Sequence, residues 1–305
     1  MIIEFFTHQN LFLKALSMYK KWIILDCNFL CHRAKHSMGG LSHGDSATGV
    51  IYGFLKGLIS YQEMFDTSNF VFCLDSKSSK RKEVYPEYKA NRINHDLDDE
   101  EIEFENAFRH QMKMLRKEYL KTIGFKNVLC QKGYEADDLI ASVSINIPSD
   151  QEAVIVSSDH DLFQLLSFNV SQYLPNINKT VSLQWFKKTY GIKPTIWPVV
   201  KALAGCSGDN VIGIKGAGEN TIIKYLKKEL NPETKTYKKI VEQEPDFFQT
   251  NHPLVALPYA GTKVFKLKKD NLSQDGWNKV TAKLGMRSIK DRLPIQLNKR
   301  KHKNG

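Results

Sequence analysis

The chain has 305 residues, with 44 lysines and arginines against 33 aspartates and glutamates, so its formal net charge is +11. A hydrophobic share of 42% and a charged share of 25% are typical of an ordinary soluble globular protein. Every apolar run is too short to span a bilayer. The basic balance favours a polyanionic partner, with nucleic acid first and an anionic membrane surface second.

The cysteines and the N-terminus predict a cytoplasmic protein. There are five cysteines, an odd count, with no CxxC pair, which indicates buried thiols in a reducing compartment. Residues 1–20 lack the basic start of a signal peptide, and His8, Gln9 and Asn10 interrupt their apolar stretch. This segment reads either as an amphipathic helical extension or as residues ahead of a true start at Met18.

Two apolar β-favouring runs end in an acid. The first is Trp22–Asn28, in which Asp26 follows the apolar residues, and the second is Asn69–Asp75. Between them, Ser46–Phe65 has apolar residues at helical spacing. Ligands of parallel sheets bind outside the carboxyl ends of the strands, so Asp26 and Asp75 are candidate site residues. The alternative is a polar residue that merely leaves each strand.

A basic segment and an acidic segment follow. Ser76–Arg92 carries six basic residues with Tyr85 and Tyr88 between them, a composition that suits phosphate binding and base stacking, although a solvated loop is the alternative. Residues 96–105 contain seven acids and lead into a helical pattern that continues to Leu120. We interpret these acids as the solvated start of a helix and not as metal ligands.

Acids gather in two places between Gly133 and Leu166. Strands are predicted at Lys126–Cys130 and Ala153–Asp159, and their alternation with helices indicates a parallel α/β sheet. Carboxylates held close together raise each other's pKa unless a cation neutralises them, and hard ions such as Mg²⁺ take oxygen ligands. The acids are Glu135, Asp137, Asp138, Asp159 and Asp161.

The later part of the chain is predicted to be mostly helical. A hairpin with its turn at residues 176–178 precedes a helix–turn–helix pattern over Val199–Leu230. Glycines spaced for tight turns at Gly213, Gly216 and Gly218 and the start of the next helix predict an anion site, with a plain helical hairpin as the alternative. From Asn231 onward the signals are weak, and residues 296–305 form a basic tail.

Six motifs occur in an order that resembles a known family. They are LDCN, FCLD, YPEYKANR, GYEADDLIA, SSDHDLFQL and GDNVIGIKGAG, spread from Trp22 to Leu230. The pattern is similar to the flap endonuclease or 5′ nuclease family, which includes phage 5′-3′ exonucleases, phage RNase H and the 5′ nuclease domain of bacterial DNA polymerase I. The absence of an attached polymerase within the chain looks most like the phage-type or stand-alone bacterial enzymes.

The resemblance implies the fold and its divisions. We expect an α/β fold with a central, mostly parallel sheet flanked by helices, which is the PIN-like 5′ nuclease core, over residues 21–185. A helical arch is expected at about 77–122. A helical helix–hairpin–helix subdomain that binds duplex DNA is expected over 186–295, after an N-terminal extension of residues 1–20 and before the basic tail of 296–305.

The resemblance also implies roles for individual residues and cofactors. Lys89 and Arg92 match catalytic basic residues at the foot of the arch. The expected ions are two Mg²⁺, for which Mn²⁺ can substitute, with K⁺ at the glycine turn. The first metal is matched by Asp26, Asp75, Glu135, Asp137 and Asp138, and the second by Asp159, Asp161 and Asp209. The expected DNA contacts are Arg81, Tyr88, Gly213, Lys215, Gly216, Gly218 and Lys224.

One position departs from the family pattern. The family commonly reads GDxxDN before the glycine turn, whereas this chain reads GCSGDN with Cys206 at the first acid. A thiol is a poor ligand for Mg²⁺, which puts the second metal site in doubt. Ala217 also replaces a larger apolar residue, for which we expect only a packing effect.

The predicted function is a metal-dependent, structure-specific 5′ nuclease in DNA replication and repair. The expected partners are DNA with 5′ flaps, gaps or nicks, RNA·DNA hybrid in primer removal, and replication proteins, with a monomeric enzyme, no membrane, and the cytoplasm of a bacterial or phage-infected cell. One alternative is a DNA-binding relative that is weakened by Cys206. Another is an RNA-cleaving PIN-like enzyme, which the glycine turn argues against.

Overall fold

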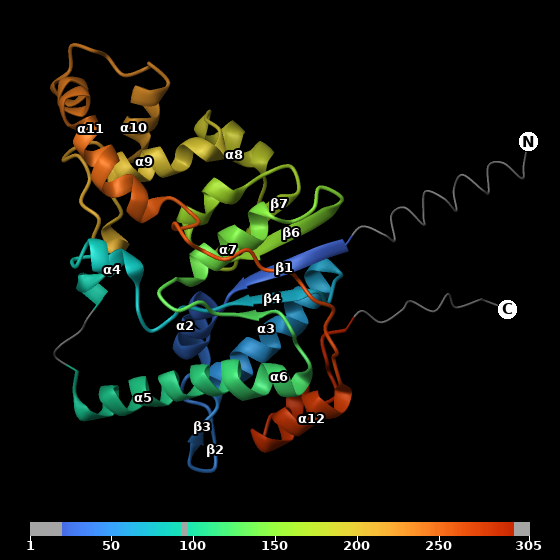
Figure 1. Cartoon of the computed structure of the whole chain (residues 1–305). Helices are drawn as coiled ribbons and strands as arrows, with labels where there is room; N and C mark the ends of the chain where they lie inside the picture. The colour runs from blue at the N-terminus through green and yellow to red at the C-terminus, as the bar shows by residue number, and fades with distance from the viewer. Residues whose placement is uncertain (1–19, 93–96, 296–305) are drawn as a thin grey trace, which may run out of the picture.

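The computed structural model describes residues 20–92 and 97–295 (Figure 1). The predicted N-terminal extension up to residue 19, the first acid of the acidic segment and the basic tail lie outside the described residues. Within those two ranges, no helix is both long and apolar enough to cross a membrane.

A six-stranded sheet forms the centre of the molecule, in the order β5-β4-β1-β6-β7-β8. Neighbouring strands run parallel except β8, which is antiparallel to β7 and forms the predicted hairpin. This arrangement confirms the predicted mostly parallel α/β fold. The strands are β1 Lys20–Asp26, β4 Phe70–Cys73, β5 Val128–Leu129, β6 Gln151–Val156, β7 Val170–Leu174 and β8 Lys179–Val181.

The order of the strands reverses at β1. From β1 the chain builds β4 and β5 on one side, and then returns to add β6 and β7 on the other. Such a reversal of strand order opens a crevice at the carboxyl ends of the strands, where α/β proteins bind their ligands. Asp26 is the last residue of β1, and Asp75 follows β4 by two residues.

Helices cover both faces of the sheet (Figure 1). The larger core lies on one face and includes Phe54, Phe72, Phe125 and Trp277. It joins α2 Cys27–Met38, α3 Gly49–Phe65, α5 Asp99–Met114, the π-helical turn η2 Leu115–Tyr119, α6 Leu120–Ile123 and α12 Gln274–Lys283. The opposite face is covered by α7 Ala136–Ile145 and the 3₁₀-helix η3 His160–Leu165.

The boundaries of two predicted helices have local causes. Helix α5 begins after Asp98, whose carboxylate accepts a hydrogen bond from the Glu101 backbone N–H while the Glu101 side chain returns to Asp98, so the acids here are the solvated helix start that we predicted. Helix α3 begins at Gly49 and not at Ser46, because residues 46–47 form strand β3 against β2 Ser42–His43.

A third core holds the helical part of the chain together. Phe163, Phe186 and Trp197 pack at its centre. It contains α8 Leu183–Tyr190, η4 Pro194–Ile196, α9 Trp197–Ala204, α10 Glu219–Leu226 and α11 Lys235–Val255. Sequence analysis found no strong signal for α11 or α12. Pro245 and Pro253 lie inside α11 and interrupt the helical pattern that would have indicated it.

After α11 the chain returns to the sheet as an extended segment, Ala256–Ser273, which we call the strap. Figure 1 shows it crossing from the end of α11, past the edge of the sheet, to α12. Its Leu257, Phe265 and Leu267 pack against the core between the sheet and α7. The 3₁₀-helix η6, Arg287–Ile289, follows α12.

A buried ion pair ties the segment after β4 to the rest of the fold. Arg81, on α4 Lys80–Val84, is 2% exposed, and its two terminal nitrogens lie 2.8 and 2.7 Å from the carboxylate oxygens of Asp138 on α7. Its Nε donates to the Leu254 carbonyl at 2.7 Å. The same carboxylate accepts from the backbone N–H groups of Tyr259 and Glu135.

This geometry corrects two predictions. Arg81 is enclosed by protein, so its guanidinium is not placed to contact DNA. Both oxygens of Asp138 are already engaged by Arg81 and by backbone donors, so its carboxylate is not available to a metal ion in this structure. Both residues act in the architecture of the site, because they fix α4 and α7 against each other and against the end of α11.

Replacing Arg81 with methionine should destabilise the protein strongly. Removing one partner leaves the Asp138 carboxylate buried and unpaired, which costs roughly 3–5 kcal/mol. Urea unfolding followed by circular dichroism measures the loss. The double variant Arg81→Met/Asp138→Leu should recover much of it, and Lys82→Met, a change at an exposed position on the same helix, should have little effect. Equal stability of Arg81→Met and the unmodified protein would contradict this account.

Candidate active site

Four carboxylates converge at the crevice, and we call them the carboxylate cluster. Asp26 ends β1, Asp75 follows β4, Asp137 lies in the first turn of α7, and Asp159 precedes η3. The charges of Asp75 and Asp159 help to raise the pKa of Asp26, and those of Asp159, Asp26 and Asp75 help to raise the pKa of Asp137, which places the four acids in one electrostatic group. The sheet therefore brings together acids that are separated by more than a hundred residues in the sequence.

Backbone and hydroxyl donors fix these carboxylates in place. Asp26 caps α2, and one of its oxygens accepts from the backbone N–H of Phe29 at 3.0 Å while the other accepts from the Ser157 hydroxyl at 2.9 Å. Asp75 accepts from the backbone N–H of Ala136 at 2.6 Å. Helix termini and strand ends supply these donors, so the cluster is preorganised by the fold itself.

Burial opposes the negative charge of part of the cluster. Burial, together with the charges of Asp75 and Asp159, raises the pKa of Asp26 to about 7 against the hydrogen bond from Phe29. Burial and the charges of Asp159 and Asp26 also raise the pKa of Asp137 well above its ordinary value. Ionised oxygens in such a group are the donor set of a hard divalent cation, so these residues fit such an ion.

A second group, which we call the clamp, lies beside the cluster. The Tyr88 hydroxyl lies 3.0 Å from both Glu135 Oε2 and Asp209 Oδ2. Lys89 Nζ lies 2.7 Å from Glu135, and Arg92 Nη2 lies 2.6 Å from Asp209. These contacts neutralise Glu135 and Asp209 with cations of the protein itself.

The clamp holds two loops together. One loop ends in the 3₁₀-helix η1 Ala90–Arg92. The other contains the 3₁₀-helix η5 Ser207–Asp209, which precedes the glycine turn. The Lys89 backbone N–H donates to the Asp209 carbonyl at 2.9 Å, and the Asn91 side chain donates to the Ser207 carbonyl at 2.8 Å. Lys89 has the left-handed φ of 55°, which costs about 1–2 kcal/mol and persists only because these contacts fix it.

Tyr88 has a different role from the one predicted. Its side chain is 2% exposed, and burial with the charges of Glu135 and Asp209 raises the pKa of its hydroxyl. A buried tyrosine cannot stack on a base, so that prediction is wrong for this structure. Tyr88 is instead a protonated donor that links Glu135 to Asp209.

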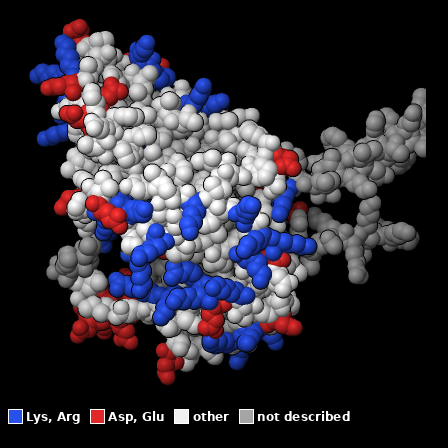
Figure 2. Space-filling view, in the orientation of Figure 1, with Lys and Arg blue, Asp and Glu red and all other residues white. Residues whose placement is uncertain are grey.

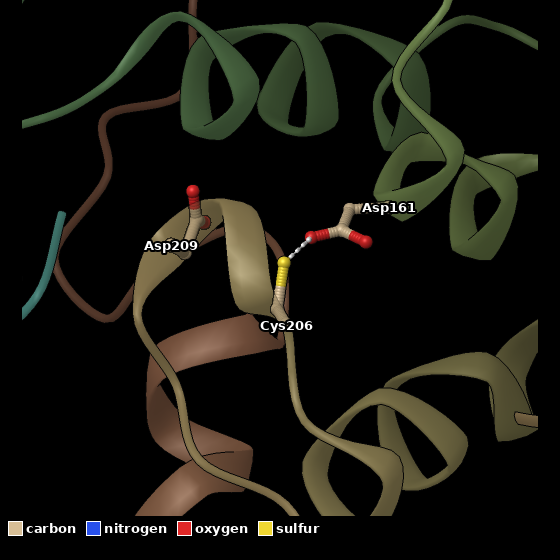
Figure 3. Close-up of side chains that lie close together, drawn as sticks. All are labelled: Asp161, Cys206 and Asp209. Atoms are coloured by element: carbon tan, nitrogen blue, oxygen red, sulfur yellow. Dashed lines mark hydrogen bonds between the residues drawn. The ribbon is translucent and has the colours of Figure 1, made fainter. Parts of the chain in front are cut away.

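A third group surrounds Cys206 and is drawn in Figure 3. One donor atom from each of Asp161, Cys206 and Asp209 lies within 4.8 Å of the others. Cys206 Sγ donates to Asp161 Oδ2 at 3.7 Å. On the other side of the same carboxylate, Lys201 Nζ lies 2.9 Å from Asp161 Oδ1, and it also lies 3.0 Å from Glu219.

The donor chemistry of this third group suits a hard cation less well than the carboxylate cluster does. Burial and the charges of Asp161 and Asp209 raise the pKa of the Cys206 thiol to about 12, so it remains protonated at neutral pH. Burial and Asp159 raise the pKa of Asp161 to about 6, although Lys201 opposes this shift. The close spacing of the three donors is therefore offset by a thiol and by an ammonium group that already neutralises Asp161.

Sequence reasoning missed several residues at the site. Lys201 is 8% exposed, and it was not singled out although it is the single charged residue in the apolar helix WPVVKALA, which is the signal that could have found it. Ser157 binds Asp26, and Asn28 accepts from the Asp75 backbone N–H at 3.1 Å. Small polar residues beside the acids carried no distinct signal in the sequence.

The glycine turn between α9 and α10 differs in detail from the prediction. Gly216 has the expected positive φ, 86°. Gly213 does not, but a Cβ atom there would lie 2.1 Å from the Ala204 carbonyl, so glycine is needed for close backbone packing. Gly218 has φ −70° and caps α10. Among the predicted DNA contacts in this element, Lys215, Gly216, Gly218 and Lys224 are exposed.

Sequence comparisons match this chain to 5′-3′ exonucleases and to DNA polymerase I. A family model described as the 5′-3′ exonuclease N-terminal resolvase-like domain matches residues 21–191. The 5′-3′ exonuclease of Bacillus subtilis is 33% identical over 186 residues, which cover 59% of each chain. The thermostable DNA polymerase I of Thermus caldophilus is 33% identical over 210 residues, which cover 68% of this chain and 24% of that one. The chain therefore spans about a quarter of the length of this polymerase relative.

Solved structures share the fold at lower identity. Bacteriophage T5 flap endonuclease, in a complex with DNA and metal ions, matches with a TM-score of 0.67 and 20% identity over 90% of this chain and 98% of that one. The catalytic core of Rad2 in complex with DNA substrate matches with a TM-score of 0.55 and 15% identity over 91% and 93%. The family model covers more than half of the chain, and the chain belongs to the 5′-3′ exonuclease family.

Proposed function

We propose that this protein is a metal-dependent, structure-specific 5′ nuclease that hydrolyses phosphodiesters near 5′ ends or at flap junctions. The observation that carries the proposal is the carboxylate cluster, four acids at the switch point of a parallel sheet, of which Asp26, Asp75 and Asp137 have raised pKa values. The Lys89 and Arg92 cations lie beside it. Cleavage in replication and repair, including removal of RNA primers, is the context that the family suggests.

The metal ions are proposed to be Mg²⁺, with Mn²⁺ able to substitute. Asp26, Asp75, Asp137 and Asp159 would hold the first, with Glu135 at its margin. A divalent ion bound there supplies an activated water and neutralises charge on the phosphate. Asp161 and Asp209 would hold a second ion more weakly, because Lys201 and Cys206 occupy their surroundings. The exposed backbone of the glycine turn is the proposed K⁺ site.

The proposed roles of the protein's own groups follow from their charge and exposure. Lys89 and Arg92 would exchange their ion pairs with Glu135 and Asp209 for contacts with the phosphate. There they would stabilise its developing charge. Lys215 and Lys224 would grip the duplex through its phosphates, with Gly216 and Gly218 offering backbone N–H groups. The proposed substrates are DNA with 5′ flaps, gaps or nicks and RNA·DNA hybrid, bound by a monomer.

The proposed division of the chain follows the observed cores. Residues 21–185 would form the nuclease core, with the arch at about 77–122, and residues 186–295 would contain the duplex-binding subdomain. The structure requires one qualification of that boundary, because the strap and α12 return to the sheet and pack with the nuclease core. A second candidate function, a DNA-binding relative with weakened catalysis, is favoured by the Lys201–Asp161 pair and the Cys206 thiol.

Replacing Asp159 with alanine should abolish cleavage and preserve binding. Loss of a ligand carboxylate from the cluster should lower the rate with Mg²⁺ by about a thousandfold, equivalent to roughly 4 kcal/mol of transition-state stabilisation. A labelled 5′-flap oligonucleotide measures cleavage, and anisotropy in EDTA measures binding. Asp150→Ala removes an acid from an exposed turn and is the matched control. Cleavage by Asp159→Ala at the unmodified rate would remove Asp159 from the site, and no product from the unmodified protein at enzyme excess would reject the proposed activity.

Replacing Cys206 with aspartate should raise the rate of cleavage at low Mg²⁺ concentrations. The change adds an ionised oxygen donor next to Asp161, so the Mg²⁺ concentration for half-maximal cleavage should fall by about tenfold, or about 1.4 kcal/mol. Cys206→Ser keeps a small neutral side chain and should leave the titration unchanged. A Mg²⁺ titration that is the same for Cys206→Asp and the unmodified protein would show that no ligand is missing at this position.

Without metal, the cluster should make stability depend on pH. The folded pKa of Asp26, about 7, lies above its ordinary value of 3.8, so the folded state binds the proton more tightly. Stability is then lost as pH rises between these values, by up to about 1.4 kcal/mol per pH unit, and the loss is complete above pH 7. Asp26→Asn keeps the helix cap and removes the charge.

Urea unfolding in EDTA tests this dependence. The advantage of Asp26→Asn over the unmodified protein should grow from pH 5 to pH 7 and then level off, and Mg²⁺ should reduce it at pH 8. Asp150→Asn makes the same change of charge in an exposed turn and should show no such trend. A difference between Asp26→Asn and the unmodified protein that does not vary with pH would contradict the assignment.

A further inference from the structure

The strap presents a row of lysines on the outside of the sheet edge. Phe265 and Leu267 point into the core, so Val264, Lys266 and Lys268, which alternate with them, point outward in this extended segment. The exposed lysines of the strap are Lys263, Lys266, Lys268 and Lys269. Figure 2 shows lysines and arginines gathered over this face of the molecule, where the strap crosses the sheet edge.

Hydrogen bonds hold this row in place. The Asn127 side chain accepts from the Lys268 backbone N–H and donates to the Lys268 carbonyl, both at 2.8 Å. The Lys263 backbone N–H donates to the Gln131 side chain at 2.9 Å, and the Lys263 carbonyl accepts from the Ser142 hydroxyl at 2.6 Å. The lysine side chains therefore extend from a backbone that is fixed to the sheet edge, and not from a free loop.

The row continues from the strap toward the carboxylate cluster. Exposed Lys126 and Lys132 flank β5, and exposed Lys80 begins α4. The Lys80 backbone N–H donates to the Gly133 carbonyl at 2.9 Å, which places it next to Lys132. We call this set the lysine track, and it consists of Lys80, Lys126, Lys132, Lys263, Lys266, Lys268 and Lys269.

The charges of the track are not neutralised within the described part of the chain. No carboxylate of residues 20–92 or 97–295 forms an ion pair with a track lysine. Asp270 accepts from the Lys126 backbone N–H at 2.7 Å and is the nearby acid. By contrast, the cations of the clamp and Lys201 are all paired with carboxylates.

We propose that the lysine track binds the sugar–phosphate backbone of an unpaired nucleic-acid arm that extends from the carboxylate cluster. The proposal rests on the proposed nuclease function, because that function supplies a substrate with such an arm. The end of the track at Lys80 adjoins Arg81 and the clamp. Figure 1 shows α9 and α10, the proposed duplex grip, on one side of α4 and the strap leading away from it toward the sheet edge.

Two features favour an unpaired arm over a duplex. Lys266 and Lys268 project from the same side of one extended segment, and exposed Lys263 and Lys269 lie at its two ends, so the strap lysines form a narrow file that suits one phosphate backbone. Val264 lies within this file and is 68% exposed, so an apolar side chain is available to the face of an unpaired base, whereas the bases of a duplex are stacked and covered. Unpaired lysines on a fixed backbone bind phosphates by releasing counterions, which makes the contact salt-dependent and independent of sequence.

Charge reversal on the strap tests the proposal. The variant Lys266→Glu/Lys268→Glu/Lys269→Glu is compared with the unmodified protein by anisotropy in EDTA, on nicked duplexes that carry 5′ arms of 0, 10 or 20 nucleotides. The unmodified protein should bind more tightly as the arm lengthens. The variant should lose this gain. With the longest arm, the slope of its log affinity against log salt concentration should be smaller by about 2, because each phosphate contact with a single strand contributes about 0.7 to the slope. Binding to the duplex without an arm should change little.

A second variant controls for net charge. Lys56→Glu/Arg287→Glu/Lys290→Glu makes the same change in charge at exposed positions on the α3 side of the sheet, where Tyr52 and Ser288 join α3 to η6. It should retain the gain from the arm. The proposal is overturned if the strap variant keeps that gain, if both variants lose it equally, or if poly-glutamate of matched charge displaces the arm as well as an unlabelled arm does. Binding in EDTA needs no hydrolysis, so the result stands apart from the cleavage assay that tests the proposed function.

Cys130 offers an independent readout in the unmodified protein. This exposed thiol lies between Lys126 and Lys132, while Cys27, Cys31 and Cys73 are buried. A 20-nucleotide arm should slow alkylation of Cys130 by maleimide, measured by peptide mass spectrometry, by severalfold relative to the duplex without an arm. Equal alkylation rates with and without the arm would place the arm away from the track and would overturn the proposal.

Discussion

Repulsion among the acids at the carboxyl ends of β1, β4 and β6 is the constraint on which the site depends. Burial raises the pKa values of Asp26, Asp75 and Asp137, and the charges of neighbouring acids, Asp159 among them, raise those of Asp26 and Asp137 as well. The sheet enforces this proximity, because parallel strands end at one edge and the chain reverses its direction of growth at β1. Such an arrangement costs stability unless cations balance it, so the positions of the cations determine how the rest of the site is built.

The protein supplies cations around the cluster but not within it. Lys89 and Arg92 neutralise Glu135 and Asp209, Arg81 neutralises Asp138, and Lys201 neutralises Asp161. For Arg81 the pair is buried and bidentate, and so it acts in the architecture. Asp26 and Asp137, by contrast, form no ion pair with any described cation, and burial with the charges of neighbouring acids raises their pKa values. An acid without a protein cation is the one for which an external ion is most favourable.

The sequence could predict the features that depend on local pattern. Apolar runs that end in Asp26 and Asp159 predicted the strands, and the family motifs named the candidate acids, although the structure groups Asp159 with Asp26 and Asp137 and pairs Asp138 with Arg81. Pairing across the fold could not be predicted in the same way. The Arg81–Asp138 and Lys201–Asp161 pairs join residues from different helices and loops, and no spacing in the chain indicates them. Tyr88 was assigned to DNA because aromatic residues among lysines suggest stacking, but its burial depends on packing against Ala202, Val211 and Leu254.

The same contrast separates the two halves of the site. At the carboxylate cluster, no described basic side chain occupies an ion-pair position on Asp26 or Asp137. Around Cys206, an ammonium group and a protonated thiol contact the two oxygens of Asp161, one on each. A lysine that already balances a carboxylate lowers the electrostatic gain from adding a divalent ion, and a neutral thiol removes a negative ligand. Both differences act in the same direction, so the asymmetry between the two proposed metal positions follows from charge and does not require any change in the fold.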